Sequence, residues 1–482
     1  MELDDNKLIV SLKLMFFDVN VKTKISKYMK EKINVENMLI FYQLSKIFDL
    51  PSIGKTAFNY IERCFTIVAD TDSFLQLDFN VVLNILSNSN LDISSEIQIF
   101  NAAEKWVNYN IKERIKFAKD LLLKVRFPLL SHHAIKYLTQ QPSSFSRANE
   151  CTAILNKILD NKNYYFQNKS SIYFTNRYCN QDMFNILVCG GYYESKESCF
   201  LSSSNVNQFY GCNFKSVRTF PSMIKKSFDH KAVVLKGEVY VLGGFYWEGF
   251  INGFPELINK ISVEKYSPAT NAWSTIGNMY DDSDHFCACG FMDKIFVIGG
   301  YYKNRDIMFS DSCLELDTKT YKWKEVARIN QARMNAACAV FEGSIVVCGG
   351  EDGHGLGLRT VEKYDVLADE WSSMPNMIHG KNYHSLVVVR NKLFVIGCNG
   401  DGCELFENSY NQFVCLKSPF NSYNCSNVVS ISSKIVIFEE NTSKIVYYDV
   451  DKCKWSEDLC EVTDQIFGFS CIRVPSAKRE NV

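Results

Sequence analysis

The sequence lacks several features that would place it in other classes of protein. Its 482 residues include 53 Lys and Arg and 54 Asp and Glu, so a formal net charge of −1 gives no general attraction for nucleic acid or acidic lipid. No run of about 18 apolar residues is present, and we therefore expect no membrane-spanning helix. The acidic start, Met1-Glu2-Leu3-Asp4-Asp5, is unlike a secretory signal peptide.

Paired metal-ligand spacing is also missing. The 18 cysteines are scattered, and the alternating Cys287 and Cys289 fit packing within one strand better than a metal site. So many unpatterned thiols favour a cytoplasmic or nuclear protein. His230, His285 and His384 recur at about the same place in three repeats, but no carboxylate accompanies each at a fixed offset. We expect no metal and no other cofactor.

Catalytic arrangements are lacking as well. No Gly-x-Gly-x-x-Gly leads into a helix, so the glycine pairs do not predict a nucleotide loop. We find no paired carboxylates in a glycosidase-like arrangement and no nucleophile beside a base. The sequence therefore predicts a protein that is not an enzyme.

The sequence does contain a repeated motif, in which a short apolar run ends at two glycines. Strand composition and length predict buried strands, and the glycines suit unusual backbone angles or a close approach of another backbone. The copies are 186–191, 239–244, 295–300 and 345–350, with a weaker one at 393–397. A unit that recurs every few tens of residues is typical of a propeller or a solenoid.

A second landmark, a bulky aromatic residue, fixes the size of the unit. Exactly 26 residues separate Trp273 from Gly299, Trp323 from Gly349 and Trp371 from Gly397. The same step from Phe413 reaches the end of the apolar run 434–438, which predicts a sixth unit without its glycines. Each unit supplies about four short strands, which is one blade of a propeller.

The spacing from the glycines to the next aromatic residue varies, so the loops of free length follow the glycine pairs and gather on one face. The first unit lacks the strand that precedes the glycine strand elsewhere, whereas the chain ends with a spare one at 468–474. We therefore expect the C-terminal strand to complete blade one and close the ring, which removes exposed sheet edges.

Residues 1–166 differ in kind. Gly54 is the only glycine before Gly190, and apolar residues recur at helical spacing. Examples are the stripe of Ile97, Phe100, Ala103 and Val107 beside Trp106, and a second stripe at 115–125 closed by Phe127-Pro128. Several amphipathic helices joined by short loops predict a helical bundle.

These patterns resemble known families. Strand, Gly-Gly, Tyr-Asp and Trp in register over about 178–474 resemble the Kelch repeat. The segments 74–75, 86–91, 95–96, 106–107 and Val125-Arg126-Phe127-Pro128-Leu129-Leu130 resemble the BACK domain, and residues 25–39, 49–50 and 64–65 are similar to the last third of a BTB domain. Together they resemble the Kelch-like (BTB-BACK-Kelch) family, and we interpret the chain as carrying an N-terminally truncated BTB domain.

The resemblance implies a multidomain chain with three parts. We expect a partial BTB-like segment at 1–62 and a BACK domain at 63–168, both all-α, followed by an all-β six-bladed Kelch propeller at 169–482. Because the family dimerises and grips cullin-3 through the BTB domain, dimerisation and cullin-3 binding by the partial segment stay open. The resemblance also places substrate binding on the loop face of the propeller.

The loops after the glycines carry the candidate contact residues, because aromatic and Arg residues dominate interface hot spots. The longest, 245–254, has five aromatic residues in ten, and it could equally fold over its own blade. The candidate partner-binding residues are Tyr192, Tyr193, Phe245, Tyr246, Trp247, Phe250, Tyr301, Tyr302, Arg305, Arg333, His354 and Arg359.

The family resemblance implies a substrate-recruiting adaptor of a cullin-3 ubiquitin ligase, with the target protein on the propeller face. The alternative is a scaffold that binds actin or another cytoskeletal partner without a ligase role. The sequence predicts neither nucleic acid nor membrane as a partner.

Overall fold

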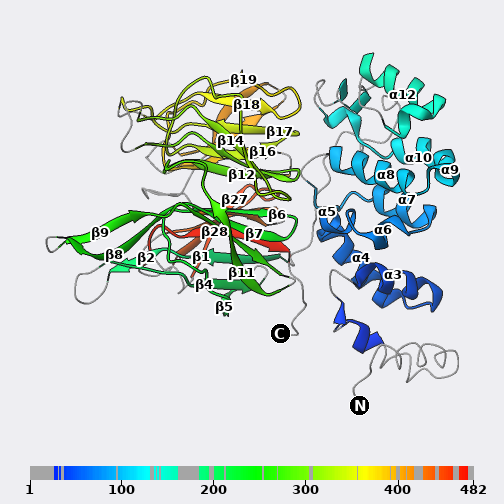
Figure 1. Cartoon of the computed structure of the whole chain (residues 1–482), viewed down its shortest axis with the longest axis horizontal. Coiled ribbons are helices and arrows are strands. Elements are labelled where there is room, and N and C mark those ends of the chain that lie inside the picture. Colours follow the sequence, from blue (N-terminus) through cyan, green and yellow to red (C-terminus); the bar gives the residue numbers. More distant parts are fainter. Residues whose placement is uncertain are drawn as a thin grey trace. The chain divides into compact units, whose positions relative to one another are not determined.

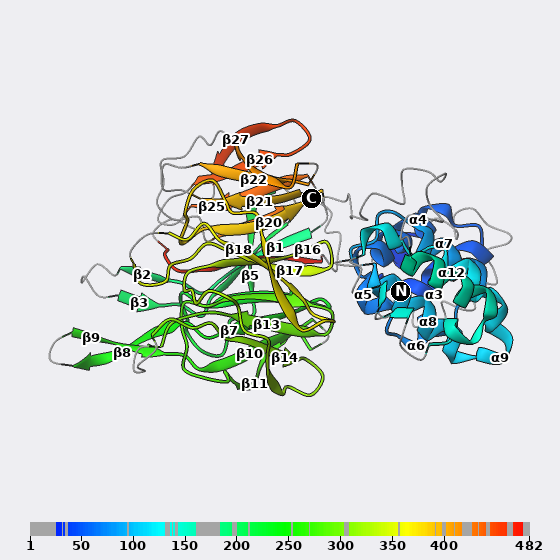
Figure 2. The same ribbon diagram turned by 90° about the horizontal axis from the view of Figure 1, so that it is seen from above.

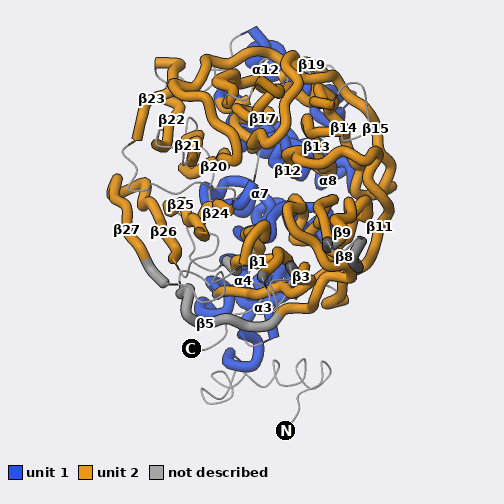
Figure 3. The backbone as a smooth tube through the Cα atoms, turned by 90° about the vertical axis from the view of Figure 1, so that its left-hand side faces the viewer, with its two compact units in different colours: residues 1–128, 138–179, 475–482 blue, residues 129–137, 180–474 orange. Residues whose placement is uncertain are grey.

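The computed structural model describes most of the chain in two compact units. The described residues are 26–30, 32–33, 37–93, 96–130, 135–136, 138–139, 143–160, 184–194, 200–210, 213–251, 254–268, 270–302, 308–354, 357–390, 392–397, 402–408, 410–416, 427–431, 433–439, 444–459 and 466–475. One unit comprises 1–128, 138–179 and 475–482, and the other comprises 129–137 and 180–474 (Figures 1 and 3).

The first unit is helical, as the sequence predicts. Its helices are α3 (Met38–Ile47), α4 (Pro51–Arg63), α5 (Phe65–Val68), α6 (Asp72–Leu75), α7 (Phe79–Ser87), α8 (Ile97–Tyr109), α9 (Ile111–Arg114), α10 (Ala118–Leu122) and α12 (Asn149–Asp160), with 3₁₀ turns η1 (Ile115–Phe117), η2 (Phe127–Leu129) and η3 (Phe145–Arg147). The second predicted stripe is therefore split between η1 and α10 rather than forming one helix.

Helix α8 lies at the centre of this unit because its apolar stripe is buried along its whole length. Ile97, Phe100, Ala103 and Val107 are each at most 2% exposed. Trp106 is equally buried, and its indole Nε1 donates a hydrogen bond of 2.9 Å to the Leu77 carbonyl, so the polar atom of this large side chain is satisfied.

The second unit is a propeller of six four-stranded antiparallel sheets. From the inner to the outer strand, the blades are β28 (Ser470–Pro475), β1 (Phe184–Cys189), β4 (Val206–Tyr210) and β5 (Asn213–Phe220); β6 (Lys231–Leu235), β7 (Glu238–Leu242), β10 (Ser262–Ser267) and β11 (Ala272–Asn278); β12 (Cys287–Phe291), β13 (Lys294–Ile298), β14 (Cys313–Asp317) and β15 (Trp323–Val326); β16 (Ala337–Phe341), β17 (Ser344–Cys348), β18 (Val361–Asp365) and β19 (Glu370–Met374); β20 (Ser385–Val389), β21 (Lys392–Ile396), β22 (Cys403–Glu407) and β23 (Gln412–Leu416); and β24 (Val428–Ile431), β25 (Lys434–Phe438), β26 (Lys444–Asp449) and β27 (Lys454–Leu459).

The six blades surround a central axis, with inner strands such as β12, β20 and β24 closest to it (Figure 3). The second strand of each blade is the apolar run recognised in the sequence, and we call it the glycine strand. It is almost fully buried because it pairs on both sides and packs against the neighbouring blades, as Val346 and Val347 of β17 do. This burial explains why the run is continuously apolar rather than alternating.

The glycine pairs stand where other residues do not fit. Gly349 and Gly350 have φ of +60° and +86°, in the left-handed region that glycine adopts without steric cost. A Cβ on Gly349 would come within 2.5 Å of Cε1 of His384, and one on Gly350 would come within 2.5 Å of the Met334 carbonyl oxygen. Both roles expected of the glycines, unusual angles and close approach, are therefore confirmed at this blade.

The C-terminal strand closes the ring, as predicted. Strand β28 pairs beside β1 in blade one, although β1 begins at residue 184 and β28 at residue 470. The junction with blade two is fixed by two hydrogen bonds: Ser470 Oγ donates to the His230 carbonyl at 2.7 Å, and the Asp229 N–H donates to the Gly468 carbonyl at 2.7 Å.

The repeated tryptophans join consecutive blades. Trp273, Trp323 and Trp371 are half-buried, and each indole Nε1 donates to a carbonyl of the preceding blade, at 2.7 Å to Pro221, 2.8 Å to Asn278 and 2.7 Å to Ala327. These residues pack against the hydrophobic core and at the same time cover the seam between two outer strands. The constant spacing of 26 residues therefore reflects a contact between blades.

Candidate protein-binding face of the propeller

Two sets of loops make up one face of the propeller, which we call the loop face. One set follows the glycine strands, and the other leads into the inner strands. Isolated antiparallel bridges join the two sets within blades one to four (Tyr192 to Phe467, Phe228 to Phe245, Asp284 to Tyr301 and Met334 to Glu351) and between blades four and five (Leu358 to Lys381). The loops of free length thus gather on one side, as the sequence indicates.

Two of these loops are β-hairpins. Strands β2 (Tyr192–Glu194) and β3 (Phe200–Ser202) follow the glycines of blade one, and β8 (Phe245–Ile251) and β9 (Phe254–Asn259) follow those of blade two. Both hairpins extend from the same side of the propeller (Figures 1 and 2), and the Trp247 N–H donates a hydrogen bond of 2.8 Å to Ser202 Oγ. The sequence predicts a loop at 245–254 but not this strand pairing.

Aromatic rings hold the bases of the hairpins together. Phe228, in the loop before β6, lies 4.8 Å from the Tyr192 ring, 6.0 Å from Phe245 and 5.9 Å from Trp247, measured between ring centroids. Tyr192 also stacks on Phe467 at 5.3 Å. Both readings of this aromatic loop therefore have a structural basis, because part of each ring serves internal packing and part stays exposed.

Exposed apolar side chains concentrate on the loop face. Large apolar side chains are exposed at eleven positions of the described propeller, and only Tyr321 and Tyr410 lie elsewhere, in turns before outer strands. The other nine are Tyr193, Leu201, Ile224, Leu257, Ile261, Tyr280, Met308, Ile378 and Tyr383. A surface that gathers apolar side chains in this way is typical of an interaction site.

The structure distributes the candidate contact residues unevenly. Tyr193, His354 and Arg359 are exposed; Tyr192, Phe245, Tyr246, Trp247 and Tyr301 are half-buried; and Tyr302 is 8% exposed, with its hydroxyl donating to Asp281 Oδ2 at 2.6 Å. Phe250 belongs to β8 but its side chain lies outside the described residues, as does the whole of Arg305.

Arg333 requires a correction, because it is fully buried and not a surface contact. Its Nη2 lies 2.7 Å from Glu362 Oε1 and 3.1 Å from Thr360 Oγ1, and its Nη1 donates to the Gly349 carbonyl at 2.8 Å. The guanidinium is occupied by these internal acceptors. Arg333 therefore ties the loop before β16 to the glycine strand and to β18.

Sequence reasoning missed the buried carboxylates that shape this face. Glu362 accepts the N–H groups of Asn330 at 2.8 Å and Gln331 at 3.3 Å, in the loop that leads into the inner strand. Glu264 and Glu404 bind the corresponding loops of blades two and five, and their cationic partners are Lys260 at 3.0 Å and Lys381 at 3.4 Å. A Glu on the buried side of the third strand is the signal that could have revealed them.

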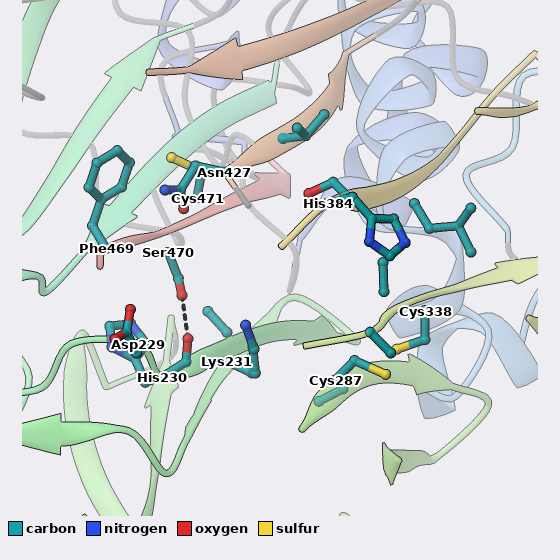
Figure 4. Close-up of a pocket in the computed structure, with 17 residues that line it drawn as sticks. Asp229, His230, Lys231, Cys287, Cys338, His384, Asn427, Phe469, Ser470 and Cys471 are labelled. Carbon is teal, nitrogen blue, oxygen red and sulfur yellow. Dashed lines mark hydrogen bonds between the residues drawn. The ribbon is translucent and has the colours of Figure 1, made fainter. Parts of the chain in front are cut away.

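A cavity of about 190 Å³ lies on the propeller axis, between the inner strands (Figure 4). Asp229, Lys231, Cys287, Cys338 and His384 are among the side chains that line it. A hydrogen bond to Cys338, together with burial, raises the pKa of the Cys287 thiol well above its usual range, so this thiol is a poor nucleophile.

The histidines that recur in three blades do not form a metal site. Among the residues that the structure describes, no group of three or more His, Cys, Asp or Glu side chains could hold a metal ion. His230 and His384 are instead buried beneath the first glycine of the preceding blade.

Within the described part of the chain, no helix is both long and apolar enough to cross a membrane.

Two family models match the chain. The model described as "BACK: BTB And C-terminal Kelch" matches residues 38–140, which belong to the helical unit except for 129–137, and the "KLHDC2/KLHL20/DRC7 Kelch-repeats domain" matches residues 178–400. The BACK match begins at residue 38, whereas we expected that domain to begin at residue 63, so the boundary between the two N-terminal segments stays a prediction.

Similar proteins with curated names are Kelch-like proteins. Kelch-like protein 7 of Rattus norvegicus is 25% identical over 382 residues, which cover 78% of this chain and 61% of the relative. Kelch-like protein 35 of Mus musculus is 23% identical over 442 residues (90% and 65%), and Kelch-like protein 36 of Bos taurus is 23% identical over 471 residues (92% and 74%). The chain thus spans about three fifths of the length of the first of these relatives.

Three findings agree with one another. The helical unit matches the BACK model, the six-bladed propeller matches a Kelch-repeat model, and the similar proteins are Kelch-like proteins. The chain therefore belongs to the Kelch-like, BTB-BACK-Kelch family.

Proposed function

We propose that this chain is a substrate-recruiting adaptor of a cullin-3 ubiquitin ligase and carries no catalytic chemistry of its own. The loop face of the propeller binds the target protein, and the helical unit contacts the cullin. The proposal extends to the domain limits 1–62, 63–168 and 169–482 and to a cytoplasmic location. The observation that carries it is the concentration of exposed apolar side chains on the loop face of a Kelch-like propeller.

Family membership supports the adaptor role, and the loop face supplies the recognition surface. Its exposed or half-buried residues are the proposed contacts: Tyr192, Tyr193, Phe245, Tyr246, Trp247, Tyr301, His354 and Arg359. Tyr302 and Arg333 hold the loops in place from beneath.

The helical unit has its own exposed apolar pair. Ile40 and Ile47 of α3 are 47% and 68% exposed, and seven residues on a helix place them on the same side, two turns apart. Because exposed isoleucines on one helix side favour a packed protein partner, we propose this side of α3 as the cullin-3 contact.

The test is binding of the full chain to purified cullin-3, measured by size-exclusion chromatography with light scattering. We expect a stable complex, and we expect Ile40→Lys with Ile47→Lys to weaken it at least tenfold because two buried isoleucines are each worth more than about 1.4 kcal/mol. Tyr410→Lys is the matched control, since Tyr410 is 75% exposed but lies in the propeller, outside the loop face.

Absence of binding by the wild-type chain would refute the ligase role. In that case co-sedimentation with actin filaments would identify the scaffold alternative. The mass of the unbound chain reports at the same time whether it dimerises.

A further inference from the structure

The β8–β9 hairpin has two faces that its register defines. Trp247 pairs with Leu257 and Tyr246 with Ile258. Because neighbouring side chains of a strand point to opposite sides, Trp247 and Leu257 share one face and Tyr246 and Ile258 share the other. Trp247 packs on Phe228, so the face that carries Tyr246 points away from that aromatic contact.

Carboxylates flank the Tyr246 face. Glu248 and Glu256 are both exposed, and burial together with these two charges raises the pKa of the Tyr246 hydroxyl. The loop before β12 continues this surface, because Asn259 Nδ2 donates to the Asp282 carbonyl at 3.0 Å. That loop presents the exposed carboxylate of Asp282 and the half-exposed ring of Tyr280.

The cations of this part of the chain are already occupied. Lys260 is buried against Glu264 at 3.0 Å, and Lys265 pairs with Glu238 at 2.9 Å. Other exposed cations of the described loop face belong to different loops, such as Lys225 before β6 and Arg359 in blade four. Since the whole chain is nearly neutral, with 53 basic and 54 acidic residues, this surface is locally acidic.

We infer that this surface, formed by Tyr246, Glu248, Glu256, Ile258, Tyr280 and Asp282 and here called the acidic aromatic surface, binds a basic segment of a partner protein in which Lys or Arg residues accompany apolar ones. The inference rests on the proposed role of the loop face in substrate binding, and it names the class of substrate segment.

The chemistry of each component fits that occupant. A Lys or Arg side chain over Tyr246 or Tyr280 gains a cation–π interaction, and Glu248 or Glu256 can accept charge-assisted hydrogen bonds from it. Ile258, half-buried on the same face as Tyr246, offers an apolar contact for a neighbouring aliphatic or aromatic residue. An acidic segment or a nucleic-acid backbone would instead be repelled by the carboxylates.

The experiment is a selection of random 12-residue peptides, displayed on phage, against the immobilised full chain at about 100 mM salt. The wild-type chain should enrich peptides that combine Lys or Arg with apolar residues. The variant Glu248→Lys/Glu256→Lys should lose that pool or enrich acidic peptides, whereas Glu370→Lys, an exposed change in β19, should select the same peptides as the wild type.

The most enriched peptide is then labelled and titrated by fluorescence anisotropy. Glu248→Gln/Glu256→Gln should weaken its binding about tenfold, or about threefold per carboxylate, and raising the salt should weaken wild-type binding. Circular dichroism checks that each variant is folded.

The inference would be overturned by a neutral or acidic pool, by no enriched pool, or by a pool that the Glu248→Lys/Glu256→Lys variant also selects. It would also be overturned if this surface pairs two copies of the chain, seen as a dimer that Glu248→Lys/Glu256→Lys converts to a monomer. A chain that binds cullin-3 but enriches no basic peptide refutes this inference alone. A chain that enriches basic peptides but ignores cullin-3 refutes the ligase role alone.

Discussion

Arg333 Nη2 and Glu362 Oε1 form an ion pair of 2.7 Å in which the two side chains are 0% and 4% exposed. Removing one member of such a pair leaves the other as an uncompensated buried charge. This pair joins the loop before β16 to β18 and therefore fixes part of the loop face from inside.

Arg333→Met should lower the free energy of unfolding by about 3 to 5 kcal/mol, because Glu362 would lose its buried counter-charge. The control is Arg328→Met, since Arg328 pairs with Asp311 at the same 2.7 Å but is 60% exposed and should cost about 1 kcal/mol or less. Unfolding in urea is followed by tryptophan fluorescence. This signal reports on the propeller, because Trp106 is the only one of the six tryptophans that lies outside it. Equal losses from the two substitutions would contradict the structural role of Arg333.

Gly349→Ala should destabilise the propeller for two separable reasons. The left-handed backbone costs an alanine about 1 to 2 kcal/mol, and the new methyl group would meet His384 Cε1 at 2.5 Å. Gly402→Ala combines the same backbone effect with a milder contact, because Gly402 has φ of +69° and its nearest neighbour would be the Leu416 carbonyl oxygen at 3.2 Å. We expect thermal unfolding to show the larger loss for Gly349→Ala, and a reversed order would refute the steric argument.

The buried histidines should make the propeller sensitive to acid. Burial, reinforced by the charges of Lys381 and Arg333, lowers the pKa of His384 to about 3, and burial also lowers the pKa of His230 to about 3. An unfolded histidine titrates near 6.5, so between these values the unfolded chain binds more protons than the folded one. Stability should therefore fall as the pH decreases from about 6.5 towards 3, by up to about 1.4 kcal/mol per pH unit for each histidine.

The variant His384→Phe tests this pH dependence. Phenylalanine fits this place in the repeat, since Phe286 of blade three and Phe469 of blade one stand at the same point before their inner strands. The substitution should remove one of the two histidine contributions to the slope of unfolding free energy against pH between about 6.5 and 4. A slope identical to that of the wild type would show that His384 does not titrate in this way.

Loss of the C-terminal strand should open the propeller. A chain ending at residue 469 lacks β28 and leaves the edge of β1 unpaired, whereas a chain ending at residue 475 keeps the whole sheet of blade one. We expect the shorter chain to lose the cooperative thermal transition of the propeller and to aggregate in light scattering, because unpaired edges recruit other strands. If both chains melt alike, ring closure does not determine stability.

The architecture could be predicted because its signals are local. The glycines in left-handed backbone, the apolar glycine strands and the tryptophans at a fixed distance recur from blade to blade. Each of these positions requires a particular residue type, so the six blades and their closure could be predicted from the sequence. The position of the tryptophans at the seam between blades could not be predicted, because the carbonyl groups that accept their hydrogen bonds belong to the preceding blade.

The candidate site was less predictable because burial depends on distant partners. Arg333 reads as a loop arginine until Glu362, 29 residues further along the chain, is seen to accept its hydrogen bond. The two hairpins were not predicted, because the aromatic residues in 245–254 fit a loop as well as a strand. Their pairing follows from contacts such as Trp247 with Ser202, which no local pattern encodes.

The pairing of β28 with β1 also sets the order of events during synthesis. A ribosome that adds about 5 to 20 residues per second needs roughly 15 to 60 s to proceed from residue 189, the end of β1, to residue 470, where β28 begins. Throughout that time blade one has no inner strand, and its edge is available to any other nascent chain. A premature stop in the last blade would leave the edge of β1 unpaired permanently. The propeller can therefore close only in chains that are translated through β28.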